Sequence, residues 1–258
     1  MFSSTNNPLY FIGQGDWEVP DPNDVSNDEG LIALSWELST EMYDRLYPSG
    51  IFPWFEQEGV VFWFSPEIRS ITATDQVKIS KSMRPYINGI KWRFSVNTAF
   101  EQVLEKCSAV ERPGQAGTWI TEKFRENFIA LHQEGKGFSF EVWDGQELVG
   151  GTFGVITGEI FVGESMFHTQ SNASKFAYIG MCQYLHAQGV VAVDNQLSTE
   201  HLDSLGAANI EREEFLEIMH HHAGSVVEDV VIPSTERFRY LSNYAHPKRC
   251  LACQTQYT

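Results

Sequence analysis

Two acidic side chains lie in apolar surroundings where they could take part in chemistry. Glu164 stands between a glycine and a serine in "FVGESMF" (161–167), and Asp194 and Gln196 end the apolar segment "VVAVDNQ" (190–196). A carboxylate in such a place can hold a cation or accept a proton, and an amide can orient a reacting group. Alternatively, both acids simply end strands and face water. Because an unpaired carboxylate inside an apolar run is costly, Glu164 must be hydrogen-bonded or stay partly wet.

A second candidate site is a run of basic residues without an acid among them, "KISKSMRPYINGIKWR" (78–93). It contains Lys78, Lys81, Arg84, Lys91 and Arg93. The whole chain has 34 acids against 18 bases, a net charge of -16, which argues against indiscriminate nucleic-acid binding. Against that background the run predicts a local contact with RNA phosphates, and a merely solvated face is the alternative.

Length and composition indicate a soluble globular protein. The 258 residues allow one large domain or a medium domain with a small one. The N-terminus has no basic leader and no apolar run approaches membrane-spanning length, so we expect a cytoplasmic protein. Four cysteines are too few for a disulfide scaffold, and Cys250 and Cys253 are interpreted as incidental thiols. The run 220–222 of three histidines is interpreted as a solvated helix end, and no metal site is expected.

Patterning predicts the elements that must position these residues. A short helix falls within 38–50 and a hairpin within 51–66, and we place a domain boundary near residue 70. Further helices are expected at 96–107, 121–135, 172–188 and 198–206. Turn signals divide 138–167 into a three-stranded antiparallel meander, and 190–196 is a buried strand.

A meander followed by a helix and another strand is the arrangement of acetyl-CoA-using acyltransferases. Those enzymes hold a pyrophosphate on a glycine-rich turn at a helix N-terminus. Here "QEGKGF" (133–138) follows a helix instead, and the helix expected at 172–188 begins without glycine. The sequence therefore does not support a CoA site.

A series of motifs in order along the chain is more specific. They are "GIFPWF" (50–55), "WFSPEIR" (63–69), "NTAFEQVLEKC" (97–107), "GTWIT" (117–121), "LVGGTFGV" (148–155), "FVGESMF" (161–167), "NASK" (172–175) and "HLDSLGA" (201–207). Together they resemble the leucyl/phenylalanyl-tRNA–protein transferase family, over about residues 30–216.

The resemblance implies an α+β fold in two parts. Residues 1–70 would form a small N-terminal domain. Residues 71–258 would form a larger acyltransferase-like (GNAT-like) aminoacyltransferase domain with a mostly antiparallel sheet flanked by helices. The implied reaction moves Leu or Phe from aminoacyl-tRNA to the α-amine of a protein that begins with Arg or Lys. The product is marked for degradation.

The family's functional positions match residues of this chain. The resemblance implies that Asp194 orients Gln196 at the reacting amine and ester, and that Glu164 binds the acceptor. It also places Trp54 and Trp119 near the terminal adenosine of the tRNA, and ordinary hydrophobic burial is the alternative for both.

The resemblance further assigns a Leu/Phe pocket. Its members here are Phe161, Tyr178, Met181 and Leu185, the last three of which form a stripe at helical spacing. From the pattern alone, such a stripe is plain core. The basic run 78–93 would contact the tRNA. No metal and no organic cofactor is implied, and we expect a monomer.

Departures from the family keep alternatives open. Asn195 stands where the family usually has Cys, and on a regular strand its side chain would point away from both neighbours. The segment 35–37, Pro48 and the tail beyond 222 also depart from the pattern. The alternatives are a tRNA-dependent paralogue that acylates another acceptor and a non-catalytic binder of basic N-termini. The sequence does not decide between Leu, Phe and Met as donors.

Overall fold

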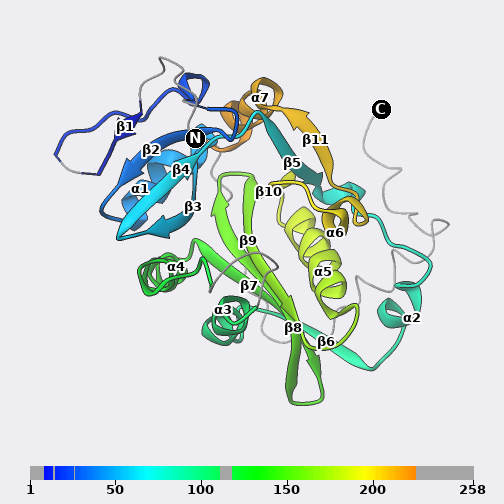
Figure 1. Ribbon diagram of the computed structural model, residues 1–258. Helices are drawn as coiled ribbons and strands as arrows, with labels where there is room; N and C mark the ends of the chain where they lie inside the picture. Colours follow the sequence, from blue (N-terminus) through cyan, green and yellow to red (C-terminus); the bar gives the residue numbers. More distant parts are fainter. Residues whose placement is uncertain (1–8, 14, 26, 111–117, 225–258) are drawn as a thin grey trace.

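Two β-sheets organise the protein, as Figure 1 shows. The structure is a computed structural model that describes residues 9–13, 15–25, 27–110 and 118–224. The smaller sheet has the strand order β1-β2-β4-β3, and the larger sheet has the order β11-β5-β10-β9-β8-β7-β6. With several helices packed on these sheets, the chain has the expected α+β fold.

The smaller sheet is built from the N-terminal part of the chain. Its elements are β1 (Tyr10–Phe11), η1 (Pro22–Asp24), β2 (Leu31–Ser35), α1 (Thr40–Leu46), η2 (Tyr47–Ser49), β3 (Phe52–Gln57) and β4 (Val60–Phe64). The expected hairpin is confirmed, because β3 and β4 pair antiparallel around a turn at Glu58 and Gly59. Both turn residues have positive φ, at 53° and 83°, as a tight hairpin turn requires.

The larger sheet is antiparallel except at one junction. Its strands are β5 (Ile68–Ala73), β6 (Trp92–Val96), β7 (Gly137–Asp144), β8 (Glu147–Thr157), β9 (Ile160–His168), β10 (Ala192–Gln196) and β11 (Ala208–Glu211). The expected meander is β7, β8 and β9, whereas β9 and β10 pair in parallel. The two sheets separate along the chain between Phe64 and Ile68, and the division into domains 1–70 and 71–258 stays a prediction.

Helices cover both faces of the larger sheet. They are η3 (Thr74–Gln76), α2 (Arg84–Ile87), α3 (Phe100–Ser108), α4 (Glu122–Gln133), α5 (Ala173–Ala187), α6 (Glu200–Asp203) and α7 (Arg212–His222). Helix α6 is shorter than the expected 198–206 at both ends, because it starts after its N-cap, Thr199, and has its C-cap at Ser204. No helix within the described residues is long and apolar enough to cross a membrane.

Two adjacent glycines of β8 let helices approach the sheet from opposite sides. A Cβ atom added at Gly150 would lie 2.6 Å from Ala173 of α5, and one at Gly151 would lie 3.2 Å from Val103 of α3. Because neighbouring strand residues point to opposite faces, α5 and α3 lie on opposite faces of the sheet (Figure 1). The core on the α3 side also includes residues of the smaller sheet, and the rings of Tyr43 in α1 and Phe128 in α4 lie 5.8 Å apart within it.

Candidate functional site

The candidate site is a cavity at the point where the neighbouring strands β9 and β10 diverge. Their last paired residues are Val162 and Asp194, after which β9 continues to His168 while β10 ends at Gln196. A cavity of about 550 Å³ opens at this end of the two strands. It is lined by residues 163–168 of β9, by 195–197, Thr199, His201 and Leu202, by three residues of α5, and by Thr152, Val110 and Trp119. Residues 52–54 of β3 complete it, so both sheets contribute to the cavity.

Glu164 lines this cavity and has a hydrogen-bond partner from the smaller sheet's side of the molecule. The hydroxyl of Tyr47, in η2, donates to Glu164 Oε1 at 2.5 Å. Burial raises the pKa of Glu164 to about 8, and the negative charge of Asp194 also raises the pKa. The Tyr47 hydrogen bond and the Arg69 cation act in the opposite direction on this pKa. The prediction that Glu164 must be hydrogen-bonded or partly wet agrees with this geometry.

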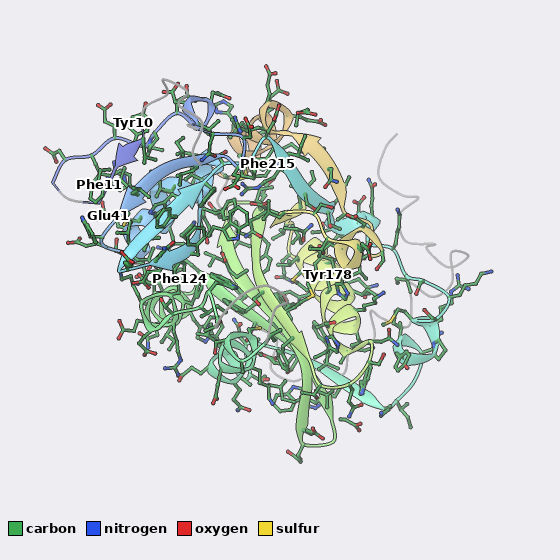
Figure 2. The ribbon with its side chains drawn as sticks, viewed as in Figure 1. Tyr10, Phe11, Glu41, Phe124, Tyr178 and Phe215 are labelled. Carbon is green, nitrogen blue, oxygen red and sulfur yellow. The ribbon has the colours of Figure 1, made fainter. Side chains whose placement is uncertain are left out.

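Asp194 lies behind the cavity and is held by a buried arginine. Arg69 Nε and Nη2 donate to the two carboxylate oxygens at 2.8 and 2.6 Å, and both side chains are 2% exposed. The guanidinium carbon lies 4.6 Å from the ring centre of Phe52 and 4.4 Å from that of Phe215, which Figure 2 labels. Arg69 Nη1 donates to the Gly50 carbonyl at 3.2 Å. The pair is therefore fixed by two parallel hydrogen bonds and two aromatic faces.

Gln196 reaches the cavity through a β-bulge. On the β5 side, Asp194 pairs with Ile71 but Gln196 pairs with Ser70, so Asn195 is an extra residue. Gln196 has φ of +59°, and its backbone N–H donates to Asp194 Oδ1 at 2.9 Å. Asn195 and Gln196 both line the cavity. The expectation that Asn195 points away from both neighbours assumed a regular strand, and the bulge interrupts that alternation before Gln196.

The two tryptophans lie on the same cavity. Trp54 comes from β3 and Trp119 from the segment before α4. Each is held by an edge-on aromatic contact, Trp54 to Phe64 at 4.8 Å between ring centres and Trp119 to Phe124 at 5.3 Å. Both tryptophans line the cavity, and their role in stacking the terminal adenosine stays a prediction.

The residues expected to form a Leu/Phe slot divide into two groups. Tyr178, which Figure 2 labels on α5, and Met181 line the cavity. Phe161 and Leu185 do not line it, and both are fully buried in the core between α5 and the sheet. They can shape the slot only through packing, so their part in binding stays a prediction.

The basic run occupies most of the connection between β5 and β6 and the first two residues of β6, and all five of its cations are exposed. Lys91 pairs with Asp144 at 3.2 Å, and the guanidinium of Arg93 lies 5.1 Å from the Trp143 ring centre. Within the described residues, Lys78, Lys81 and Arg84 have no ion pair. The start of the run meets the turn after α6, where the Lys78 N–H donates to the Leu205 carbonyl at 2.7 Å.

Several site residues escaped prediction. Arg69, Tyr47 and Met166 either contact the acids or line the cavity, yet no role was assigned to them from the sequence. For Arg69 a signal existed, because it is the one charged residue of "IRSITA", which forms β5. Its partner is 125 residues away, which no local pattern reveals.

The described residues hold no group of His, Cys, Asp and Glu side chains that could bind a metal ion. His222 ends α7 and contacts Glu159 Oε2 at 2.7 Å. Cys250 and Cys253 lie outside the described residues.

Sequence comparisons show which proteins the chain resembles. The profile described as "Leucyl/phenylalanyl-tRNA protein transferase" matches residues 71–220, and that of the corresponding N-terminal domain matches residues 37–67. A leucyl/phenylalanyl-tRNA–protein transferase of Christiangramia forsetii is 44% identical over 82% of this chain and 100% of that protein. One of Shewanella piezotolerans is 38% identical over 83% of this chain and 91% of that protein.

Among solved structures, L-PGS from Bacillus licheniformis aligns with a TM-score of 0.34 at 12% identity, over 66% of this chain and 54% of that one. So low a score adds nothing about function. The two family profiles and the curated relatives, which the chain matches over most of its length, are sufficient to identify its family. The chain belongs to the leucyl/phenylalanyl-tRNA–protein transferase family, whose members are aminoacyltransferases.

Proposed function

We propose that this enzyme transfers Leu or Phe from aminoacyl-tRNA to the α-amine of proteins that begin with Arg or Lys. The transfer would mark those proteins for degradation in the cytoplasm. The observation that carries the proposal is that Glu164 and Gln196, from two diverging strands, line one cavity together with Trp54 and Trp119. An acid, an amide and aromatic side chains on one cavity suit a cationic acceptor and an aminoacyl ester.

The proposed reaction needs no covalent enzyme intermediate. The neutral α-amine attacks the ester carbonyl carbon, and the bond from that carbon to the ribose oxygen of the terminal adenosine breaks. The amine loses a proton, and the ribose oxygen gains one. Gln196 would orient the amine and the ester, and Asp194 would act from behind by holding the Gln196 N–H.

Glu164 would receive the cationic side chain of the acceptor. With a pKa of about 8, its carboxyl group is largely protonated at neutral pH while the site is empty, so little charge is buried. An Arg or Lys side chain close by favours the ionised form, which lowers this pKa. The negative charge is then generated when its partner is present.

The tRNA would approach over the basic run. Lys78, Lys81 and Arg84 are exposed, and the backbone of Lys78 is hydrogen-bonded to Leu205, just after α6, whose Leu202 lines the cavity. Lys81→Ala with Arg84→Ala should weaken binding of charged tRNA and flatten its salt dependence by roughly one log–log unit per lost phosphate contact. Transfer from a minimal aminoacyl-adenosine donor should change little. The control is Arg125→Ala, which removes a cation from α4, outside the run and the cavity lining.

The larger sheet would be a GNAT-like scaffold used without CoA. The supporting feature is the parallel pair β9 and β10, which part to open the cavity. The enzyme would act as a monomer, without a metal or an organic cofactor.

Incubation with Leu-tRNA, Phe-tRNA or Met-tRNA, and with peptides that differ only in their first residue, tests the proposal. We expect transfer of Leu or Phe to peptides that begin with Arg or Lys and not to one that begins with Ala. Binding of such peptides without transfer would contradict the proposal and indicate a binder. Transfer to other acceptors alone would indicate a paralogue with another substrate.

A further inference from the structure

Three buried polar side chains meet directly beside Gln196. The Tyr178 hydroxyl lies 2.7 Å from Asn195 Oδ1 and 2.9 Å from Thr72 Oγ1. Asn195 Nδ2 donates to Thr72 Oγ1 at 3.0 Å. Thr72, Tyr178 and Asn195 are only 1%, 2% and 8% exposed.

The three contacts form a closed ring of hydrogen bonds. A phenol has one hydrogen, so it cannot donate fully to both neighbours. The arrangement that satisfies all three groups has Tyr178 donating to Asn195, the Asn195 amide donating to Thr72, and the Thr72 hydroxyl donating to Tyr178. Each group then donates once and accepts once. Removing any one of these groups leaves a buried donor or acceptor without its partner.

The ring connects three elements at the β-bulge. Thr72 belongs to β5, Tyr178 to α5, and Asn195 is the extra residue of β10. A bulge residue has no regular place in the strand ladder, so its position must be set by other contacts. Here those contacts come from its own side chain.

The residue that follows the bulge has an uncommon backbone conformation. Gln196 has φ of +59°, and the Leu197 N–H donates to the Asn195 carbonyl at 2.8 Å. This is a three-residue turn centred on Gln196, and it is rare for a residue with a side chain. Such a conformation persists only where its surroundings hold it in place.

We propose that the ring of Thr72, Tyr178 and Asn195 is the positioning device that holds Gln196 in this turn and keeps its side chain at the cavity. The inference rests on the proposed function, because it assumes that Gln196 takes part in transfer. Thr72 acts through Asn195 and does not line the cavity.

Thr72→Val tests the proposal because it removes the hydroxyl and keeps the shape of the side chain. We expect kcat of transfer to fall about 10-fold, with the KM values for donor and acceptor within about twofold of wild type. Thr72→Ser restores the hydroxyl and should restore most of kcat. If Thr72→Val does not fold, Tyr178→Phe removes the phenol oxygen from the ring and should lower kcat similarly.

Thr74→Val is the matched control. Thr74 follows β5 directly, is 2% exposed, and its hydroxyl donates to the Val190 carbonyl at 2.7 Å. This variant loses a buried hydroxyl hydrogen bond outside the ring, so its Tm should fall about as much as that of Thr72→Val while kcat stays unchanged. A fall in kcat equal to that of Thr72→Val would mean that the effect is general destabilisation, and would overturn the proposal.

A double-mutant cycle separates this inference from the proposed function. In the Gln196→Ala background, Thr72→Val should change kcat by less than about twofold, because the residue that it positions is gone. An unchanged kcat for Thr72→Val in the wild-type background, or an equal loss in both backgrounds, would overturn the proposal. If Gln196→Ala alone keeps wild-type turnover, the proposed role of Gln196 itself fails, and the ring has no function in transfer.

Discussion

Glu164 and Asp194 lie on the two strands that part to open the cavity, but their carboxylates have opposite kinds of partner. Asp194 faces a guanidinium that meets it with two hydrogen bonds, and both side chains are 2% exposed. Glu164 lines the cavity and accepts a hydrogen bond from a neutral phenol. One acid has its countercharge inside the protein, whereas the other has no ion-pair partner among the described residues.

This difference assigns different tasks to the two strands. A buried bidentate pair costs desolvation but fixes geometry, so Asp194 suits the role of a rigid support for the Gln196 backbone. A carboxyl group with a raised pKa can respond to what enters the cavity, so Glu164 suits the role of cation receptor. The site therefore combines a fixed charge pair with a titrating acid, and each half can be disturbed separately.

The largest effect is expected from breaking the fixed pair. Arg69→Met would leave Asp194 buried without its countercharge, which should reduce the free energy of unfolding by about 3–5 kcal/mol. Chemical denaturation followed by tryptophan fluorescence measures the loss. The matched control is Arg45→Met, which removes a guanidinium that also lies over an aromatic ring, that of Trp17, but is 34% exposed.

The double variant Arg69→Met with Asp194→Leu sharpens this test. Replacing both charges by apolar groups removes the unpaired carboxylate, so much of the lost stability should return while transfer remains weak. If the single variant Arg69→Met is as stable as wild type, Asp194 does not depend on Arg69 for its burial.

The next effect concerns the acid without an internal countercharge. Glu164→Gln keeps the shape and removes the charge, so kcat/KM should fall for peptides that begin with Arg or Lys. The fall should correspond to a loss of about 2–4 kcal/mol in transition-state stabilisation if the new pair is desolvated. Peptides that begin with Ala, and donor binding, should be affected little. The control is Glu159→Gln in the turn before β9, outside the cavity. An equal loss for charged and uncharged peptides would show that Glu164 does not recognise the cation.

The raised pKa of Glu164 also predicts a pH-dependent stability. Between its ordinary value of 4.5 and about 8 the folded state keeps the proton while the unfolded state loses it. The unfolded state then binds fewer protons, so stability falls as pH rises through this window. Because the cavity admits water, we expect Glu164→Gln to gain only about 2 kcal/mol over wild type between pH 5 and pH 8. Urea denaturation at several pH values measures the difference between the two proteins, and a constant difference would contradict the raised pKa.

Regular patterns in the sequence predicted the elements that carry these residues. Alternation and turn residues gave the meander and the β3–β4 hairpin, because hydrophobic period and turn chemistry are local. The apolar run around Glu164 indicated that the acid lies in a buried environment. Within the cavity, Trp54 and Trp119 were expected from family motifs, and both line it.

Contacts made between distant segments could not be read in the same way. A helix such as α5, buried on nearly every side, gives no periodic signal for the side that faces a cavity, so Leu185 could not be separated from Met181. The bulge at Asn195 depends on Thr72 and Tyr178, which lie far from it in sequence. Tyr47 is 117 residues from Glu164, and only the tertiary fold brings the two side chains together.

The smallest expected effect comes from this Tyr47 contact. The phenol hydrogen bond stabilises the ionised form of Glu164, so Tyr47→Phe should raise the pKa of Glu164 further. If transfer to Arg peptides requires the ionised acid, the acid limb of the pH profile of kcat/KM should shift upward by about 0.5–1 pH unit, the worth of one hydrogen bond.

Tyr43→Phe is the matched control. Tyr43 is 1% exposed, its ring lies 5.0 Å from that of Tyr47, and its hydroxyl has no hydrogen-bond partner in the described part of the chain. The two variants remove the same atom from neighbouring rings, so only Tyr47→Phe should move the profile. A shift in both variants would trace the effect to packing, and a shift in neither would mean that ionisation of Glu164 does not limit transfer.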